Sequence, residues 1–146
     1  MTVKPVPEGF HSITPYLVAR DVGKLMEFLK ATFHAVEIFH LPGPDGSIMH
    51  AEMQLGDSKL MIGEACEEWG PVTSGLYVYV PDVDATYARA LAAGATALRP
   101  VENQFYGDRS GGVKDAWGNT WWISTHIEEV SPEEMENRMA AMAPPA

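Results

Sequence analysis

The side chains best suited to acid–base chemistry in this sequence are a histidine and two glutamates, His50, Glu52 and Glu64. His50 and Glu52 are two residues apart in a run that alternates polar and apolar residues, so in a strand both side chains point to one face. Glu64 ends the next apolar segment, which is expected to form the neighbouring strand. An imidazole with two carboxylates can transfer protons or hold an ion, and no spacing motif narrows that choice.

A second group of candidate residues lies in the glycine-rich stretch around Gly107. Phe105, Tyr106 and Arg109 are large side chains that no hydrophobic period brings together, so we expect a loop that contacts a ligand. The Arg109 guanidinium suits either a ligand carboxylate or a structural pair with Asp108 or Glu102, and the structural pair is favoured.

Strand-like segments that alternate with two helical segments must position these residues. The apolar stripes that follow Asp21 and Asp82 predict two helices, each with an aspartate at its N-cap. Ser131-Pro132 predicts the start of a third helix, over residues 131–142. Strands are predicted at residues 13–20, 36–41, 48–55, 59–63, 76–80, 96–99, 111–115 and 120–127.

The two helices and their flanking strands form an internal repeat. Asp21-Val22 and Asp82-Val83 are 61 residues apart, and the turn glycines Gly56 and Gly118 are 62 apart. The sequence therefore predicts an α+β fold in one domain, residues 1–146, with two βαβββ modules at residues 12–66 and 74–128. The modules are expected to form a curved mixed sheet with helices on its convex face and a ligand cavity on its concave face.

This pattern resembles the vicinal-oxygen-chelate superfamily, the group of glyoxalase I, fosfomycin- and bleomycin-resistance proteins and extradiol dioxygenases. It is most similar to the PhnB-like branch. The resemblance covers residues 13–128 and rests on the paired modules, on Thr14-Pro15-Tyr16-Leu17 and on the hairpin Val113-Lys114-Asp115-Ala116-Trp117-Gly118. His34 departs from the family, whose first helix usually ends in glycine.

The resemblance implies a metal site whose ligands are His or Glu on the first and last strand of each module. Counting from the capping aspartates and turn glycines places those four positions at Thr14, Leu60, Gly75 and Trp122. None of these is a usual metal ligand. We therefore expect no metal and no cofactor, which removes the chemical basis for glyoxalase I or dioxygenase activity.

The same registers predict which side chains face the cavity, because strand side chains alternate between faces. The resulting cavity is aromatic and acidic, which suits a planar or cationic ligand. By this count His126 corresponds to Glu64 in the repeat. The inward set is Thr14, Tyr16, Val18, His50, Glu52, Gln54, Leu60, Ile62, Glu64, Tyr77, Tyr79, Trp122, Ser124 and His126.

Composition excludes several classes of partner. The 146 residues carry 20 acidic against 10 basic side chains, and this net charge of -10 repels a nucleic-acid backbone. Cys66 is the single cysteine, so no intramolecular disulfide can form. No apolar run reaches the length of a signal peptide or a membrane span, so we expect a cytoplasmic protein without a membrane partner.

The function expected from the sequence is glyoxalase-like and bleomycin-resistance-like binding of a small molecule by a metal-free homodimer. The resemblance implies the bleomycin-resistance proteins as the model, since they are acidic dimers that sequester a drug at the subunit interface. The alternative is a vicinal-oxygen-chelate enzyme, of the lyase, isomerase or dioxygenase type, with a site relocated to His50, Glu52 and Glu64. A partner protein that uses the methionine-bearing C-terminal helix is a third hypothesis. The expected ligand-binding residues are Tyr16, Tyr77, Tyr79, Phe105, Tyr106, Arg109 and Trp122.

Overall fold

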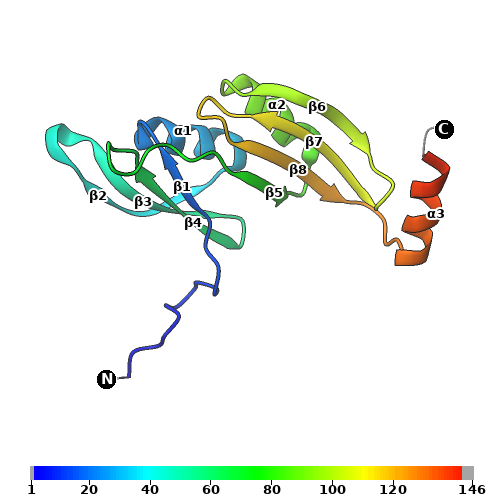
Figure 1. Ribbon diagram of the computed structural model, residues 1–146, viewed down its shortest axis with the longest axis horizontal. Coiled ribbons are helices and arrows are strands. Elements are labelled where there is room, and N and C mark those ends of the chain that lie inside the picture. Colours follow the sequence, from blue (N-terminus) through cyan, green and yellow to red (C-terminus); the bar gives the residue numbers. More distant parts are fainter. Residues whose placement is uncertain (1, 143–146) are drawn as a thin grey trace.

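Two βαβββ modules and a C-terminal helix make up the chain in the computed structural model, which describes residues 2–142 (Figure 1). The expected α+β class and two-module architecture are confirmed. The first module contains β1 (Tyr16–Ala19), α1 (Val22–Phe33), β2 (Val36–Pro42), the short 3-10 helix η1 (Pro44–Gly46), β3 (Ile48–Leu55) and β4 (Ser58–Glu64). The second contains β5 (Gly75–Tyr79), α2 (Val83–Ala92), β6 (Thr96–Asn103), β7 (Asp108–Lys114) and β8 (Thr120–His126), followed by α3 (Pro132–Met142).

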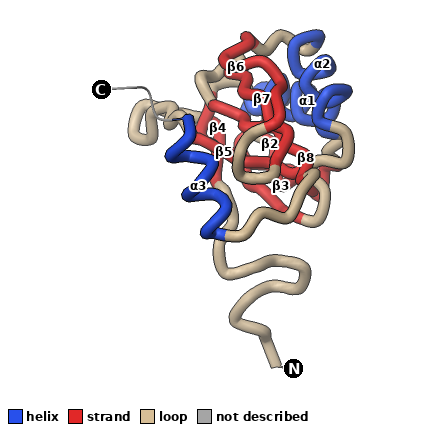
Figure 2. The backbone as a smooth tube through the Cα atoms, turned by 90° about the vertical axis from the view of Figure 1, so that its right-hand side faces the viewer, coloured by secondary structure: helices blue, strands red, loops and turns tan. Residues whose placement is uncertain are grey.

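Each module forms its own four-stranded mixed sheet. The strand orders are β1-β4-β3-β2 and β5-β8-β7-β6, with β1–β4 and β5–β8 parallel and the other pairs antiparallel. Helices α1 and α2 pack on the sheets and contact each other, and α3 lies apart from both (Figure 2). We call the face of each sheet that these two helices leave uncovered its open face.

The core lies between the helices and the sheets. Leu25 and Leu29 of α1 are fully buried, in the same hydrophobic cluster as the β-strand residues Ile62, Trp121 and Ile123. Burial of each such side chain stabilises the fold by about 1.5–3 kcal/mol. Both expected N-caps form, because each aspartate accepts a hydrogen bond from the backbone N–H three residues later. Among the described residues, no helix is both long and apolar enough to cross a membrane.

Strands β6 and β7 extend further than the sequence predicts. β6 continues through Pro100, which it tolerates as an edge strand because one row of its backbone groups needs no partner. β7 begins at Asp108, so Arg109 and Ser110 are strand residues rather than loop residues. Gly111 and Gly112 are therefore within a sheet, where Gly112 packs beneath the Trp122 ring, whereas Gly107 lies in the turn before β7.

The turn from β7 to β8 is organised around the buried carboxylate of Asp115. One carboxylate oxygen accepts the backbone N–H groups of Trp117 and Asn119, and the other accepts the Asn119 side-chain amide and the Trp121 indole N–H. The same turn ties the modules together, since the Trp117 indole N–H donates to the carbonyl of Arg20 at 2.7 Å. Asp115 therefore holds both the turn and the contact between modules.

We expect Asp115→Ala to lower the free energy of unfolding by about 2–4 kcal/mol, because it leaves a buried indole N–H and two backbone N–H groups without an acceptor. Chemical denaturation monitored by circular dichroism measures the loss. Asp57→Asn, in the exposed turn at the corresponding end of the first sheet, is the control and should change stability by less than about 0.5 kcal/mol. A loss below about 1 kcal/mol for Asp115→Ala would contradict this role.

Candidate functional site

The open face of the second sheet carries two rows of side chains across its strands. Cross-strand pairing aligns Arg99, Gly112, Trp122 and Tyr77 in one row. The adjacent row contains Glu102, Ser110, Ser124 and Tyr79. This register places Tyr77, Tyr79 and Trp122 on one face, as their alternation in the sequence predicts.

Asp108 is the centre of a hydrogen-bond network on this face. Its side chain is buried, and one carboxylate oxygen accepts the phenol O–H groups of Tyr77 at 2.6 Å and Tyr79 at 2.9 Å. The other carboxylate oxygen lies 2.8 Å from Nδ1 of His126, whose Nε2 is 3.0 Å from Glu129. Both tyrosine rings are thereby fixed in orientation while they remain about half exposed.

The network fixes the charge state of its members. Burial alone would raise the pKa of Asp108, but the hydrogen bonds from Tyr77, His126 and Tyr79 outweigh it and lower that pKa. The Asp108 contact, and then Glu129, raises the pKa of His126 above 6.5. Burial and the Asp108 bond raise the pKa of Tyr77, and the Asp108 bond with burial does the same for Tyr79. Near pH 6, Asp108 is therefore a carboxylate, His126 is mainly an imidazolium and both phenols are neutral.

Arg99 and Trp122 form a stacked pair in the adjacent part of the same face. The guanidinium carbon lies 4.8 Å from the indole centroid, a cation–π contact. The indole lies over Gly112, where an added Cβ would be 2.4 Å from the ring. Arg99 Nη2 donates to the hydroxyl of Ser110 at 3.3 Å, and Ser110 is also bonded to Ser124.

The open face of the first sheet carries a smaller cluster around His50. Its Nδ1 is 3.3 Å from the Tyr16 hydroxyl and its Nε2 is 3.7 Å from the Glu52 carboxylate. The ring centroids of Tyr16 and Phe39 lie 5.7 and 6.2 Å from that of the imidazole. The Tyr16 ring lies over Gly63, whose lack of a side chain leaves room for it.

Three residues expected in the cavity lie on the other face, and the prediction for them is wrong. Leu60 and Ile62 are buried beneath the helices. The Glu64 carboxylate accepts the backbone N–H groups of Asp21 and Val22 at 3.0–3.1 Å, so it caps α1 instead of joining His50 and Glu52. Its equivalent in the second module is Thr125, which accepts the N–H of Val83, so His126 is not the counterpart of Glu64.

The error comes from unequal hairpin turns. Two residues join β3 to β4, whereas five join β7 to β8, so an equal count from the turn glycines reaches opposite faces. Pairing with β1 and β5 shows that Met61, not Leu60, is the counterpart of Trp122. The four positions that bear the metal ligands in the superfamily are therefore occupied here by Thr14, Met61, Gly75 and Trp122.

These four residues do not fit the superfamily's divalent metal ion. Thr14 offers a weak neutral hydroxyl and Met61 a soft thioether, and neither a carboxylate nor an imidazole stands at any of the four positions. Within residues 2–142, no group of three or more His, Cys, Asp or Glu side chains is arranged to hold a metal. We therefore assign no metal-dependent step to this face.

The residues around Gly107 separate in the structure. Arg109 makes a bidentate ion pair with Asp84 of α2 and a hydrogen bond to Asn103. The sequence predicted a structural ion pair with Asp108 or Glu102, and the prediction of these two partners is wrong. Because the pair with Asp84 lies on the helix-covered side, Arg109 is not placed to contact a ligand on the open face. Phe105 and Tyr106 stack edge to face in the turn between β6 and β7, next to the Asp108 network.

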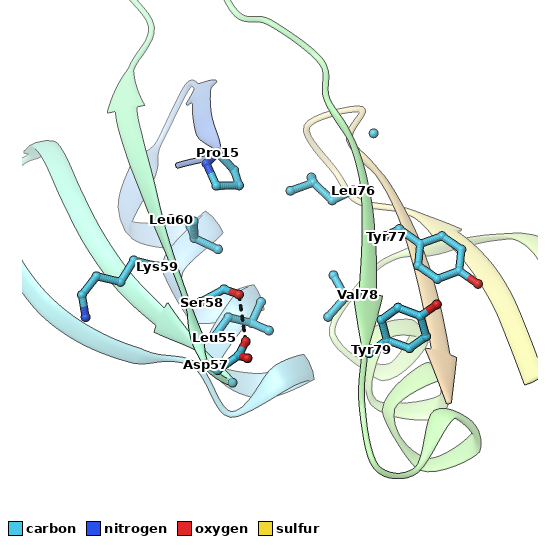
Figure 3. A pocket seen from close by; sticks show the side chains of 12 residues that line it. Pro15, Leu55, Asp57, Ser58, Lys59, Leu60, Leu76, Tyr77, Val78 and Tyr79 are labelled. Atoms are coloured by element: carbon cyan, nitrogen blue, oxygen red, sulfur yellow. Dashed lines mark hydrogen bonds between the residues drawn. The ribbon is translucent and has the colours of Figure 1, made fainter. Parts of the chain in front are cut away.

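Two hollows lie beside the sheets, and the larger one lies on the opposite side of β5 from the Tyr77 and Tyr79 rings. A cleft of about 630 Å³ lies between the β3–β4 hairpin and β5, with Leu76 and Val78 directed toward Leu60 and the Tyr77 and Tyr79 rings turned away (Figure 3). A hollow of about 400 Å³ lies against Tyr16, Val18, Met49, Gly63, Glu64 and Trp69.

The sequence interpretation missed Asp108, Arg99 and Trp69. Asp108 lies in the part of β7 that the neighbouring glycines led us to treat as a loop, whereas Arg99 lies in a predicted strand but was not considered as a binding residue. Trp69 reaches the first sheet because Val72 pairs with Val18, a contact between segments far apart in the chain. If the strand had been predicted to begin at Asp108, the alternation of side chains along it would have placed Asp108 on the same face as Ser110 and Gly112.

His126 gives a pH signature of the network. We expect NMR titration to give its imidazole a pKa above 6.5, and Asp108→Asn to reduce that pKa more than Glu129→Gln, because the Asp108 bond is the larger cause. Because the pKa of His126 is raised on folding, its ion pair contributes fully to the free energy of unfolding below about pH 6.5. That contribution is lost as the pH rises through the pKa of His126 in the folded protein. Equal effects of the two variants would contradict the ion pair.

Comparison with known proteins agrees with this architecture. Relatives include the uncharacterized protein Rv0887c of Mycobacterium tuberculosis (strain ATCC 25618 / H37Rv), 32% identical over 143 residues, with 89% of this chain and 83% of that protein covered. The uncharacterized protein Mb0911c of Mycobacterium bovis is also 32% identical, with 89% of this chain and 93% of that protein covered.

Solved structures share the fold. TioX from Micromonospora sp. ML1 superposes with a TM-score of 0.70 at 25% identity, covering 80% of this chain and 99% of TioX. The PhnB protein from Bacillus cereus superposes with a TM-score of 0.65 at 19% identity, covering 79% of this chain and 99% of that one. Residues 9–123 match the family model of the Glyoxalase/Bleomycin resistance protein/Dioxygenase superfamily, and the chain belongs to that superfamily.

Proposed function

We propose that the protein binds a planar organic molecule on its open faces, without the divalent metal of its superfamily. The observation that carries this proposal is the pair Tyr77 and Tyr79, whose rings are about half exposed yet held in orientation by Asp108. Fixed aromatic rings gain affinity because little conformational freedom is lost on binding. Tyr16 and Phe39 of the first module, and Trp69 beside its sheet, supply further exposed aromatic surface.

The cationic preference expected from the sequence loses part of its support. It relied on Glu52 and Glu64, but Glu64 caps α1. On the second sheet the Asp108 charge faces the His126 imidazole, and Arg99 adds a positive charge. We therefore propose a planar ligand, and we propose that only the region around Glu52 favours a cationic group.

We propose that the protein is a homodimer in which a second copy covers exposed apolar surface of the open faces. β2 is an edge strand that exposes residues on both of its faces, among them Phe39 and Leu41, which are 42% and 53% exposed. An edge strand with exposed apolar side chains favours association, and a two-fold dimer is the commonest closed arrangement.

Sedimentation velocity at micromolar concentration should give the mass of a dimer. Phe39→Glu combined with Leu41→Lys should shift the sample to monomer, because charges would replace the exposed apolar contacts. Val3→Lys, which changes an exposed residue of the N-terminal segment, is the control and should leave the dimer intact. A monomeric wild-type protein would refute the dimer.

Binding is measured by isothermal titration calorimetry with naphthalene-2-carboxamide, a neutral planar probe. Tyr79→Leu should weaken binding about 3- to 10-fold, because one stacked aromatic contact contributes about 0.5–1.5 kcal/mol beyond area burial. Tyr79→Phe keeps the ring but loses the Asp108 bond that orients it, so its affinity should lie between those of Tyr79→Leu and the wild type. Glu133→Ala in α3 should have no effect. Absence of saturable binding, or equal affinity of Tyr79→Leu and wild type, would contradict the proposal.

An enzyme of the same superfamily is the second candidate, and the geometry of Glu52 favours it. The Glu52 side chain is only 12% exposed and its nearest ionic contact is His50 at 3.7 Å. A carboxylate in such a setting can act as a base toward a bound molecule. If a small amount of protein converts an excess of a compound that it binds, and Glu52→Gln abolishes that conversion, the enzyme is favoured. Stoichiometric binding without conversion of the compound favours the binding protein.

A further inference from the structure

The guanidinium of Arg99 has unmet hydrogen-bonding capacity on the open face of the second sheet. Nη2 has one long bond, to Ser110, and Nε is sealed from solvent with no hydrogen-bond partner. Nη1 makes no hydrogen bond to residues 2–142 and is not among the sealed atoms. Nη1 is therefore the guanidinium nitrogen that is open to an added acceptor.

Other arginines of the second half of the chain are satisfied internally. Arg109 makes its bidentate pair with Asp84, and Arg138 pairs with Glu128 and Glu134. Arg89 donates to the carbonyl of Thr32 and to a threonine hydroxyl. In contrast, Arg99 makes no ion pair with any carboxylate of the described residues, although Glu102 shares its strand and face.

The position of Arg99 is also fixed by its surroundings. The indole of Trp122 supports one side of the guanidinium, and Gly112 leaves the space that lets the indole lie flat. Ser110 is itself held by Ser124 at 2.8 Å. A planar guanidinium supported in this way presents its donors in a fixed plane, which matches the two oxygens of a carboxylate.

We propose that Arg99 binds the carboxylate of an aromatic acid whose ring stacks on Tyr77 and Tyr79. This inference rests on the proposed function and adds the ligand's charge to it. A singly charged carboxylate fits this face better than a phosphate dianion, because Asp108, Glu102 and Glu129 lie on or beside it and the chain has a net charge of -10.

The test compares three probes of one ring system by isothermal titration calorimetry: naphthalene-2-carboxylate, naphthalene-2-carboxamide and 2-naphthyl phosphate. Wild-type protein should bind the carboxylate roughly 10-fold more tightly than the carboxamide, which corresponds to about 1.4 kcal/mol. Arg99→Gln should abolish that ratio while leaving carboxamide binding in place. Arg99→Lys, which keeps the charge without the planar fork, should give an intermediate ratio. Lys24→Gln removes a positive charge from exposed α1 and should keep the wild-type ratio.

The outcomes separate the two proposals. Equal wild-type binding of the carboxylate and the carboxamide overturns the assignment of Arg99 but leaves the proposed function standing. The assignment of Arg99 is also overturned if the preference for the carboxylate persists in Arg99→Gln. Tighter binding of 2-naphthyl phosphate than of the carboxylate overturns the proposed carboxylate ligand and indicates a phosphoryl ligand. No binding of any probe overturns the proposed function and this inference together. The wild-type comparison needs no variant, so a folding defect in Arg99→Gln cannot hide the result.

Discussion

The pairing register of the parallel strand pairs, β1 with β4 and β5 with β8, controls which side chains reach the open faces. Tyr16 pairs with Met61 and Tyr77 with Trp122, so the two modules follow the same geometry. Because strand side chains alternate, a shift of one residue would send Leu60 and Ile62 to solvent and expose the core beneath the helices. The burial of those two residues therefore fixes the chemistry of the opposite face.

A glycine in each sheet determines how the aromatic side chains lie. Gly63 and Gly112 each lie beneath a ring, that of Tyr16 in the first sheet and that of Trp122 in the second. A Cβ at either position would overlap the ring, so the rings would stand away from the sheet. The flat arrangement of Trp122 in turn supports the Arg99 guanidinium. Two residues without side chains thus shape the surface available to a ligand.

The electrostatics of the open faces differ from the average charge of the chain. The molecule has a net charge of -10, yet the second sheet contains the Arg99 guanidinium and an imidazole whose pKa Asp108 raises. Asp108 can be buried because two phenols and an imidazole satisfy it. Two of these bonds orient the tyrosine rings and the third holds the imidazole, so one carboxylate organises the charge and the aromatic surface together.

The sequence by itself determined the two modules, the helix caps at Asp21 and Asp82 and the alternation of Tyr77 and Tyr79, because these depend on residues close together in the chain. Of the four metal positions of the family, the count from the sequence agrees with the strand pairing at Trp122, whereas the pairing replaces Leu60 by Met61. Only the tertiary structure decided that Glu64 caps α1, that Arg109 pairs with Asp84 and that Asp108 joins the tyrosines. Those contacts link segments 25 to 43 residues apart, and their partners depend on strand register and turn length, which local patterns do not encode.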